Sequence, residues 1–146
     1  MYSLPLSVKY IKPSEDVYVT ETVYDRNTGL RTFQRTTFNG LRQSPPDDSP
    51  SEIVFDKLGR PQQLEWHHKD ELHRTAGPAT VFRNTESGIH TSERFYIAGR
   101  PRDPSLGPQV IRRDPRTGEI KAQGRECDMD YETPFTKPAN TPKPTL

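Results

Sequence analysis

Three of the four histidines, His67, His68 and His73, lie within seven residues of one another. Neutral imidazole nitrogens bind zinc or act as general bases, and a carboxylate such as Glu65 or Asp70 could complete either kind of site. Successive residues of a strand point to opposite faces, so only one of His67 and His68 could join His73. A hydrogen-bonding role for His73 within its loop is the simpler interpretation, and we expect no metal or other cofactor.

Arginines recur in the long connections between predicted strands, at what look like matching places: Arg42, Arg74 and Arg102. A row of guanidinium groups could contact phosphates, and an aromatic side chain such as Tyr96 could stack on bases. However, 21 basic and 20 acidic residues give a net charge of only +1. This balance disfavours nucleic-acid binding, and it favours structural pairing of each arginine with carbonyl groups or a neighbouring carboxylate.

Four carboxylates alternate with other residues near the end of the chain, at Glu126, Asp128, Asp130 and Glu132. In a strand they would share one face, as a hard-metal site requires. An edge strand with a solvated charged face is the simpler prediction. The single cysteine, Cys127, has no partner thiol in the sequence, so we expect a structural role for it and a reducing, cytoplasmic location.

The segments that must position these residues are short and rich in β-branched and aromatic side chains, which favour strands. Between them lie loops with glycine, asparagine or proline, which favour tight turns. The pattern predicts four hairpins, with strands at residues 17–24 and 31–38, 53–56 and 62–68, 80–83 and 89–97, and 109–113 and 119–124. The connections between hairpins are too short for a crossover helix, so the sheet should be antiparallel throughout.

The hairpins belong to a unit that repeats about every thirty residues. Only 29% of the residues are hydrophobic, which makes a thick core unexpected, whereas six phenylalanines, six tyrosines and one tryptophan argue against disorder. We therefore predict an all-β fold, an antiparallel meander of consecutive hairpins in a single twisted or partly closed sheet. The expected organisation is an N-terminal extension (1–14), a repeat domain (15–126), and an acidic segment with a proline-rich tail (127–146).

The clearest copy of the repeat reads Leu72-His73-Arg74, then Gly77-Pro78-Ala79, then Thr85 to Gly88. It follows Trp66 and precedes Phe95-Tyr96. Over about residues 35–123 the pattern resembles the divergent MORN-like repeats of bacterial, phage and large-virus proteins. The resemblance implies a sheet of consecutive hairpins and a mostly non-catalytic protein that serves as a scaffold or a binding surface, for proteins or, in some branches, for lipids.

We therefore expect a non-enzymatic binding protein of bacterial or phage origin, an inhibitor or accessory factor that engages another protein. Thin sheets often complete their burial by pairing, which favours a homodimer. The alternative is a nucleic-acid-binding module or a histidine-dependent enzyme. No apolar run approaches the roughly 20 residues that cross a bilayer, and the N-terminus lacks the pattern of a signal peptide. The residues expected to contact the protein partner are Trp66, His73, Arg74, Tyr96 and Arg102. Core packing is also expected for the aromatics, Trp66 and Tyr96 included.

Overall fold

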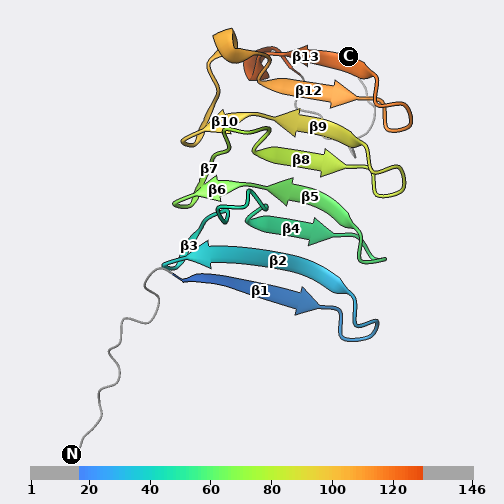
Figure 1. Cartoon of the computed structure of the whole chain (residues 1–146). Helices are drawn as coiled ribbons and strands as arrows, with labels where there is room; N and C mark the ends of the chain where they lie inside the picture. Colours follow the sequence, from blue (N-terminus) through green and yellow to red (C-terminus); the bar gives the residue numbers. More distant parts are fainter. Residues whose placement is uncertain (1–16, 130–146) are drawn as a thin grey trace, which may run out of the picture.

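A computed structural model describes residues 17–129 and shows one open antiparallel sheet (Figure 1). Eight strands follow one another in chain order, each paired with its sequence neighbours, and the sheet does not close into a barrel. The predicted all-β meander is therefore confirmed. The strands are β1 (Tyr18–Tyr24), β2 (Arg31–Phe38), β4 (Glu52–Phe55), β5 (Pro61–Glu65), β8 (Thr80–Arg83), β9 (His90–Arg94), β12 (Val110–Arg113) and β13 (Ile120–Gly124).

Three of the four hairpins turn through the same loop, which begins with Asp25, Asn84 or Asp114. In each loop the side-chain Oδ1 atom accepts hydrogen bonds of 2.7 to 3.1 Å from the backbone N–H groups two and three residues later. Each loop then needs a left-handed residue, which glycine adopts without strain. These glycines are Gly29, Gly88 and Gly118, with φ values of 75°, 79° and 80°. All four hairpin loops lie along the same side of the sheet (Figure 1).

Along the opposite side, the long connections fold into short hairpins that the sequence did not predict (Figure 1). Their strands are β3 (Leu41–Arg42) beside the end of β2, β6 (His67–His68) with β7 (Glu71–Leu72), and β10 (Tyr96–Ile97) with β11 (Arg100–Pro101). Each turns through two residues with positive φ, as a tight type I′ hairpin requires. The strands predicted at 62–68 and 89–97 are therefore each interrupted, at Trp66 and at Phe95.

The short turns occur once in each copy of the repeat, so they show which residues of the copies correspond. On this alignment Arg42, Arg74 and Arg102 do not stand at corresponding positions. The positive-φ pairs end at Gly40, Asp70 and Gly99. Arg42 comes two residues after Gly40, and Arg102 comes three residues after Gly99. Arg74 comes four residues after Asp70. Arg102 therefore occupies the place of His73, and the prediction that the arginines stand at matching positions is wrong.

The interior of the sheet is thin and half polar. Among the described residues, the buried apolar side chains are Phe55, Trp66, Ala79, Val81, Val110 and Ile111. The buried polar or charged ones are equally many: Thr36, Ser51, Glu52, His67, Thr80 and Ser92. Buried polar groups must be hydrogen-bonded to be tolerated. Hydrogen bonds that the buried polar side chains make to neighbouring strands thus contribute to the stability of this sheet, which in thicker domains comes mainly from an apolar core.

The C-terminal end of the described chain differs from its prediction. Residues Glu126–Asp128 form a short 3-10 helix and no edge strand, so their carboxylates do not line up on one face. The rest of the acidic run, the proline-rich tail and the extension over residues 1–14 lie outside the described residues. Within residues 17–129, no helix has the length and apolar character needed to span a bilayer.

Candidate functional site

Trp66 and Arg74, both predicted to contact a partner, hold a loop together. The indole is only 5% exposed, and its Nε1–H donates to the carbonyl of Asp48 at 2.8 Å. The guanidinium carbon of Arg74 lies 3.8 Å from the ring centroid. Its nitrogens also contact Asp48 Oδ2 at 2.9 Å and the carbonyl of Pro78 at 3.1 Å. Arg74 therefore joins a ring, a carboxylate and the next loop.

Phe95 and Arg102 repeat this arrangement in the following unit. The guanidinium carbon of Arg102 again lies 3.8 Å from the ring centroid, and its Nε and Nη2 donate to the carbonyl of Pro108 at 3.0 and 2.7 Å. Arg74 and Arg102 thus start from different backbone positions of the repeat, but both guanidinium groups lie over the aromatic ring of their unit and bind a proline carbonyl. Structural pairing, the favoured interpretation of these arginines, is what their contacts show, and their guanidinium groups are not presented to a phosphate.

The same contacts explain the Gly-Pro motif of the repeat. A Cβ atom at Gly77 would lie 2.9 Å from Nη1 of Arg74, and one at Gly107 would lie 2.6 Å from Nη2 of Arg102. Both distances are shorter than van der Waals contact allows. Glycine lets the guanidinium group lie against the backbone, and a side chain at either position would displace the arginine.

His73 has a local structural role, and Gln43 shows the same role in the preceding unit. Nδ1 of His73 accepts a 2.9 Å hydrogen bond from the backbone N–H of Ala98, in the next short turn. Oε1 of Gln43 accepts from the N–H of Lys69 at 3.2 Å. Both acceptors stand three residues after the positive-φ pair of their own unit. His73 thus makes a hydrogen bond, as expected, but the bond crosses to the next unit and does not lie within its own loop.

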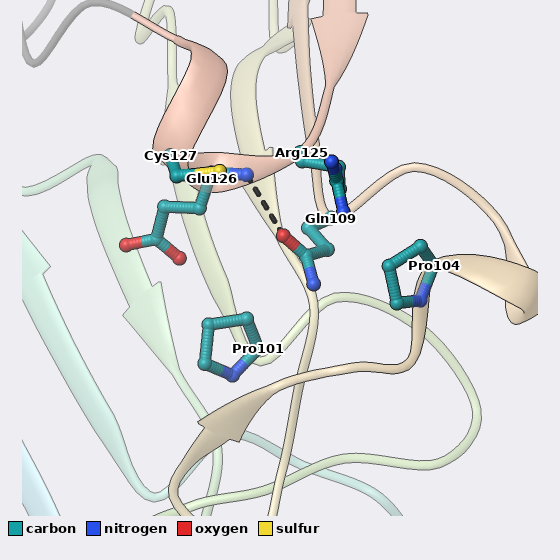
Figure 2. Close-up of a pocket in the computed structure, with 6 residues that line it drawn as sticks. All are labelled: Pro101, Pro104, Gln109, Arg125, Glu126 and Cys127. Carbon is teal, nitrogen blue, oxygen red and sulfur yellow. Dashed lines mark hydrogen bonds between the residues drawn. The ribbon is translucent and has the colours of Figure 1, made fainter.

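Tyr96, the remaining predicted site residue, is tied to Glu126. Its hydroxyl lies 2.8 and 2.9 Å from the two carboxylate oxygens, and Arg94 Nη1 lies 3.6 Å from one of them. Glu126 also lines a shallow pocket of about 350 Å³ (Figure 2). The pocket contains the exposed Cys127, and none of its lining residues is a histidine. Its lining residues are Pro101, Pro104, Gln109, Arg125, Glu126 and Cys127.

A second cluster, formed by Glu52, Glu65 and His67, was not predicted as a unit. Glu52 of β4 and Glu65 of β5 are direct cross-strand partners, and His67 begins β6. One ligand atom from each residue lies within 4.8 Å of the other two. Glu65 and His67 drew attention in the sequence as neighbours, but Glu52 did not, because only the strand register brings it to them. Cross-strand pairing is the signal that could have found it.

Electrostatics in this cluster favour neutral side chains. Burial, and then the charge of Glu52, raise the pKa of the Glu65 carboxyl. Burial, and then the nearby Arg42 guanidinium, lower the pKa of His67. Arg35 Nε lies 2.7 Å from Glu52 Oε2, and Arg42 Nη1 lies 3.7 Å from Oε1. Glu52 is therefore the member whose charge is directly paired.

Ser51 and His67 are close enough to look like a nucleophile with its base, at 2.7 Å between Oγ and Nδ1. A nucleophile has to reach its substrate. However, Ser51 is 1% exposed and His67 is 3% exposed. The hydroxyl also donates to the carbonyl of Glu65 at 3.1 Å. This pair therefore fixes the fold and does not attack a bound molecule.

Exposed apolar side chains gather on the first two hairpins. Val19, Val23 and Leu58 are 45%, 52% and 60% exposed, and Val17, Tyr24, Leu30 and Leu41 are also exposed. Among the described strands, β1 has a neighbour on one side only. This apolar edge is the feature of the described residues that points most directly to a binding surface.

Comparisons with protein families, with curated proteins and with solved structures found no match.

Proposed function

We propose that the chain is a non-enzymatic binding protein that engages another protein through the first hairpin of its sheet. The observation that supports this most is the exposure of Val19 and Val23 on an edge strand. Cross-strand partners share a face of the sheet, and Val23, Phe33 and Val54 are successive partners across β1, β2 and β4. Val23 therefore extends an apolar row that is only partly covered, and Val19, whose cross-strand partner is Thr37, adds a second exposed apolar side chain to the same face of β1.

This proposal moves the partner surface away from the residues chosen from sequence. Trp66 is buried, and the guanidinium groups of Arg74 and Arg102 are used inside the loops. His73 and Tyr96 are half-buried, with their polar atoms bonded to other parts of the chain. The side chains of these residues bind other parts of the chain and so stabilise the fold. The side chains of Val19 and Val23 are apolar and about half exposed, and they are open to a partner.

The sequence of β1 supports pairing with a second copy of the chain. Tyr18-Val19-Thr20-Glu21-Thr22-Val23-Tyr24 reads the same in both directions. If two β1 strands pair antiparallel about Glu21, Val19 faces Val23 of the other copy. Each tyrosine likewise faces a tyrosine and each threonine a threonine, whereas the two Glu21 carboxylates face each other on the axis, a like-charge contact that opposes the pairing. An interface with two-fold symmetry requires this self-complementarity.

A homodimer of this kind would enlarge the partner surface. A two-fold axis perpendicular to the sheet keeps equivalent side chains on the same face, so the apolar rows of the two copies would meet at the β1 edge. The row Val54, Phe33 and Val23 of each copy would then continue into Val19 of the other copy, with the two Glu21 carboxylates between these two rows on the same face. Dimer formation and partner binding would then use one continuous surface.

The dimer is tested by sedimentation velocity over a range of concentrations. We expect wild type to dimerise and V19K or V23K to remain monomeric, because a buried lysine at the pairing edge is strongly unfavourable. I120K places the same charge on β13, at the other edge, where Ile120 is 44% exposed, and should leave the dimer intact. A monomeric wild type at all concentrations would exclude the pairing.

Partner binding is tested separately, by affinity capture from host lysate with wild type, V23K and I120K as baits. We expect one stoichiometric protein with wild type and I120K that is lost with V23K. A protein captured equally by all three baits would place the binding surface elsewhere. Recovery of nucleic acid in a salt-sensitive form would instead support the alternative function.

A further inference from the structure

We propose that Glu52, Glu65 and His67 form a binding site for a zinc-type divalent cation, where β4, β5 and β6 meet. The inference is independent of the proposed protein-binding function, because the cluster lies away from the β1 edge. It rests on the geometry of the three ligands, on the hydrogen bonds that orient His67, and on the charges around them.

The three side chains are already close to a coordination geometry. Nε2 of His67 lies 3.7 Å from Oε1 of Glu65, and one atom from each residue lies within 4.8 Å of the others. With metal–ligand bonds of about 2.1 Å, neighbouring ligands in a tetrahedral site are about 3.4 Å apart. Nε2 of His67 and Oε1 of Glu65 would therefore have to approach by only a few tenths of an ångström, and the longest separation in the cluster, at most 4.8 Å, would have to shorten by up to about 1.4 Å through side-chain rotation.

Hydrogen bonds orient the imidazole for metal binding. The hydroxyl of Ser51 donates its single proton to the carbonyl of Glu65, at 3.1 Å. When the hydroxyl proton lies on that carbonyl, the oxygen accepts from Nδ1–H of His67, at 2.7 Å. In the neutral ring this leaves the lone pair on Nε2, directed at Glu65. Metal-binding histidines are commonly held in this way, by a hydrogen bond from the other ring nitrogen.

Nε2 of His67 is buried, and no hydrogen bond to it is found among the described residues. His67 is 97% buried by its 3% exposure. Among the described residues, the nearest polar partner of Nε2 is the Glu65 oxygen, and 3.7 Å is too long for a hydrogen bond. Two charged carboxylates this close repel each other, and either a proton held by Glu65 or a cation between the groups relieves that repulsion. A divalent cation supplies positive charge and bonds all three groups.

The surrounding arginines only partly fill this need. Arg35 binds Oε2 of Glu52 at 2.7 Å, whereas Arg42 lies 3.7 Å from Oε1. Arg42 instead donates to Asp70 Oδ1 at 2.7 Å and to its carbonyl at 3.1 Å. The charge of Arg42 acts on Glu65 and His67, but among the described residues no arginine makes an ion pair with Glu65, so Glu65 is the carboxylate left without a direct cationic partner.

The ligand types indicate the metal. Mg²⁺ and Ca²⁺ prefer sites made of oxygen, whereas an imidazole nitrogen with carboxylates suits zinc and its neighbours in the first transition row. Three protein ligands leave a fourth position for water or a partner group. The side chain of Glu65 is 23% exposed, which gives an ion a route into the cluster.

The test uses the full chain after treatment with EDTA, titrated with ZnCl₂ by calorimetry and thermal unfolding. We expect one equivalent of zinc to bind and the unfolding temperature to rise by roughly 5 to 10 °C at 100-fold excess over the dissociation constant. Co²⁺ should give the visible absorption of a four-coordinate site. E65Q and H67Q should lose both responses, whereas H68Q, which changes the exposed neighbour, should keep them.

E65Q is the decisive variant, because it preserves the shape of a half-buried side chain and the fold does not depend on it. If H67Q fails to fold, E65Q alone decides the question. A wild type without a zinc-dependent shift, or an E65Q protein that binds zinc as wild type does, would overturn the proposal. So would zinc binding that is lost in H68Q, since the ion would then lie near His68 and His73, whose rings are 5.6 Å apart.

Discussion

The guanidinium group of Arg74 lies over the buried ring of Trp66, 3.8 Å from its centroid, and reaches from there to the carbonyl of Pro78. The arginine thus covers a tryptophan that a single-layered sheet would otherwise leave open to water. It also closes the loop that leads into β8. The same pair of contacts is made by Arg102 in the next unit, which makes the arrangement a structural element of the repeat.

Loss of this arginine should destabilise the sheet. We expect R74A to lower the free energy of unfolding by about 2 kcal/mol, because a partly buried cation–π contact and charge-assisted hydrogen bonds are lost together. R74K should fall between wild type and R74A, since lysine keeps the charge but lacks the planar fork. Urea unfolding measures the difference. R116A, in an exposed loop, should change stability by less than about 0.5 kcal/mol, and an R74A effect as small would contradict the assignment.

The glycine below the guanidinium group should depend on Arg74. In G77A the new methyl group would displace the arginine, whose Nη1 it would approach to 2.9 Å. We therefore expect G77A to cost about as much as the contacts that Arg74 then loses, up to roughly 2 kcal/mol. In an R74A background the same substitution should cost almost nothing. A double-mutant cycle measures this coupling, and additive effects would show that the glycine has another purpose.

Glu65 should weaken the metal-free fold as pH rises. Its pKa is raised in the folded protein by burial and then by Glu52, from an ordinary value of 4.5. The folded state thus holds this proton more tightly than the unfolded chain. The resulting stability is fully present below pH 4.5 and is lost as pH rises through the folded pKa. In EDTA, E65Q should therefore be more stable than wild type at pH 7 and gain nothing at pH 4. A difference that does not vary with pH would contradict this.

Asp56 should produce the opposite dependence in the turn between β4 and β5. Partial desolvation acts to raise its pKa, but hydrogen bonds from the backbone and guanidinium group of Arg60, and from Leu58, outweigh it and hold the pKa at about 2. Its ordinary value is 3.8, so the stability it contributes is present above that pH and is lost as pH falls toward 2. Unfolding temperatures of wild type and D56N should converge over this interval. Parallel curves would rule out the contribution.

Much of the sheet could be predicted from sequence, because its signals are local. The strands at 31–38 and 80–83 have the predicted bounds, since a loop with Asp or Asn at its start and glycine at its end fixes where a hairpin turns. Two of the short hairpins were missed because Lys69-Asp70 and Ala98-Gly99 take positive φ without the usual Asn-Gly sequence, whereas the one at Asn39-Gly40 has that sequence but is followed by a strand of only two residues, Leu41–Arg42. At the first two of these turns a backbone hydrogen bond to the preceding short hairpin, from Asp70 to Arg42 and from Gly99 to Leu72, compensates for the low preference of these residues for positive φ.

The site residues were harder to predict, because their roles depend on register. Arg74 and Arg102 reach the same position from different places in the sequence, so matching by motif misaligned them. A hydrogen-bonding role for His73 could be predicted from sequence, but not its bond to Ala98, which lies 25 residues away. Glu52 and Glu65 meet only through the pairing of β4 with β5. No local pattern encodes such a meeting.

The different spacing of the two arginines has an engineering consequence. Arg74 reaches a proline carbonyl four residues ahead, and Arg102 reaches one six residues ahead, with a 3-10 turn at Pro104–Leu106 taking up the difference. The loop that each arginine spans is therefore a place where length varies while the sheet on either side stays in register. A short foreign peptide inserted there would be displayed at the margin of the molecule, fastened at its base by the arginine on one side and the proline on the other.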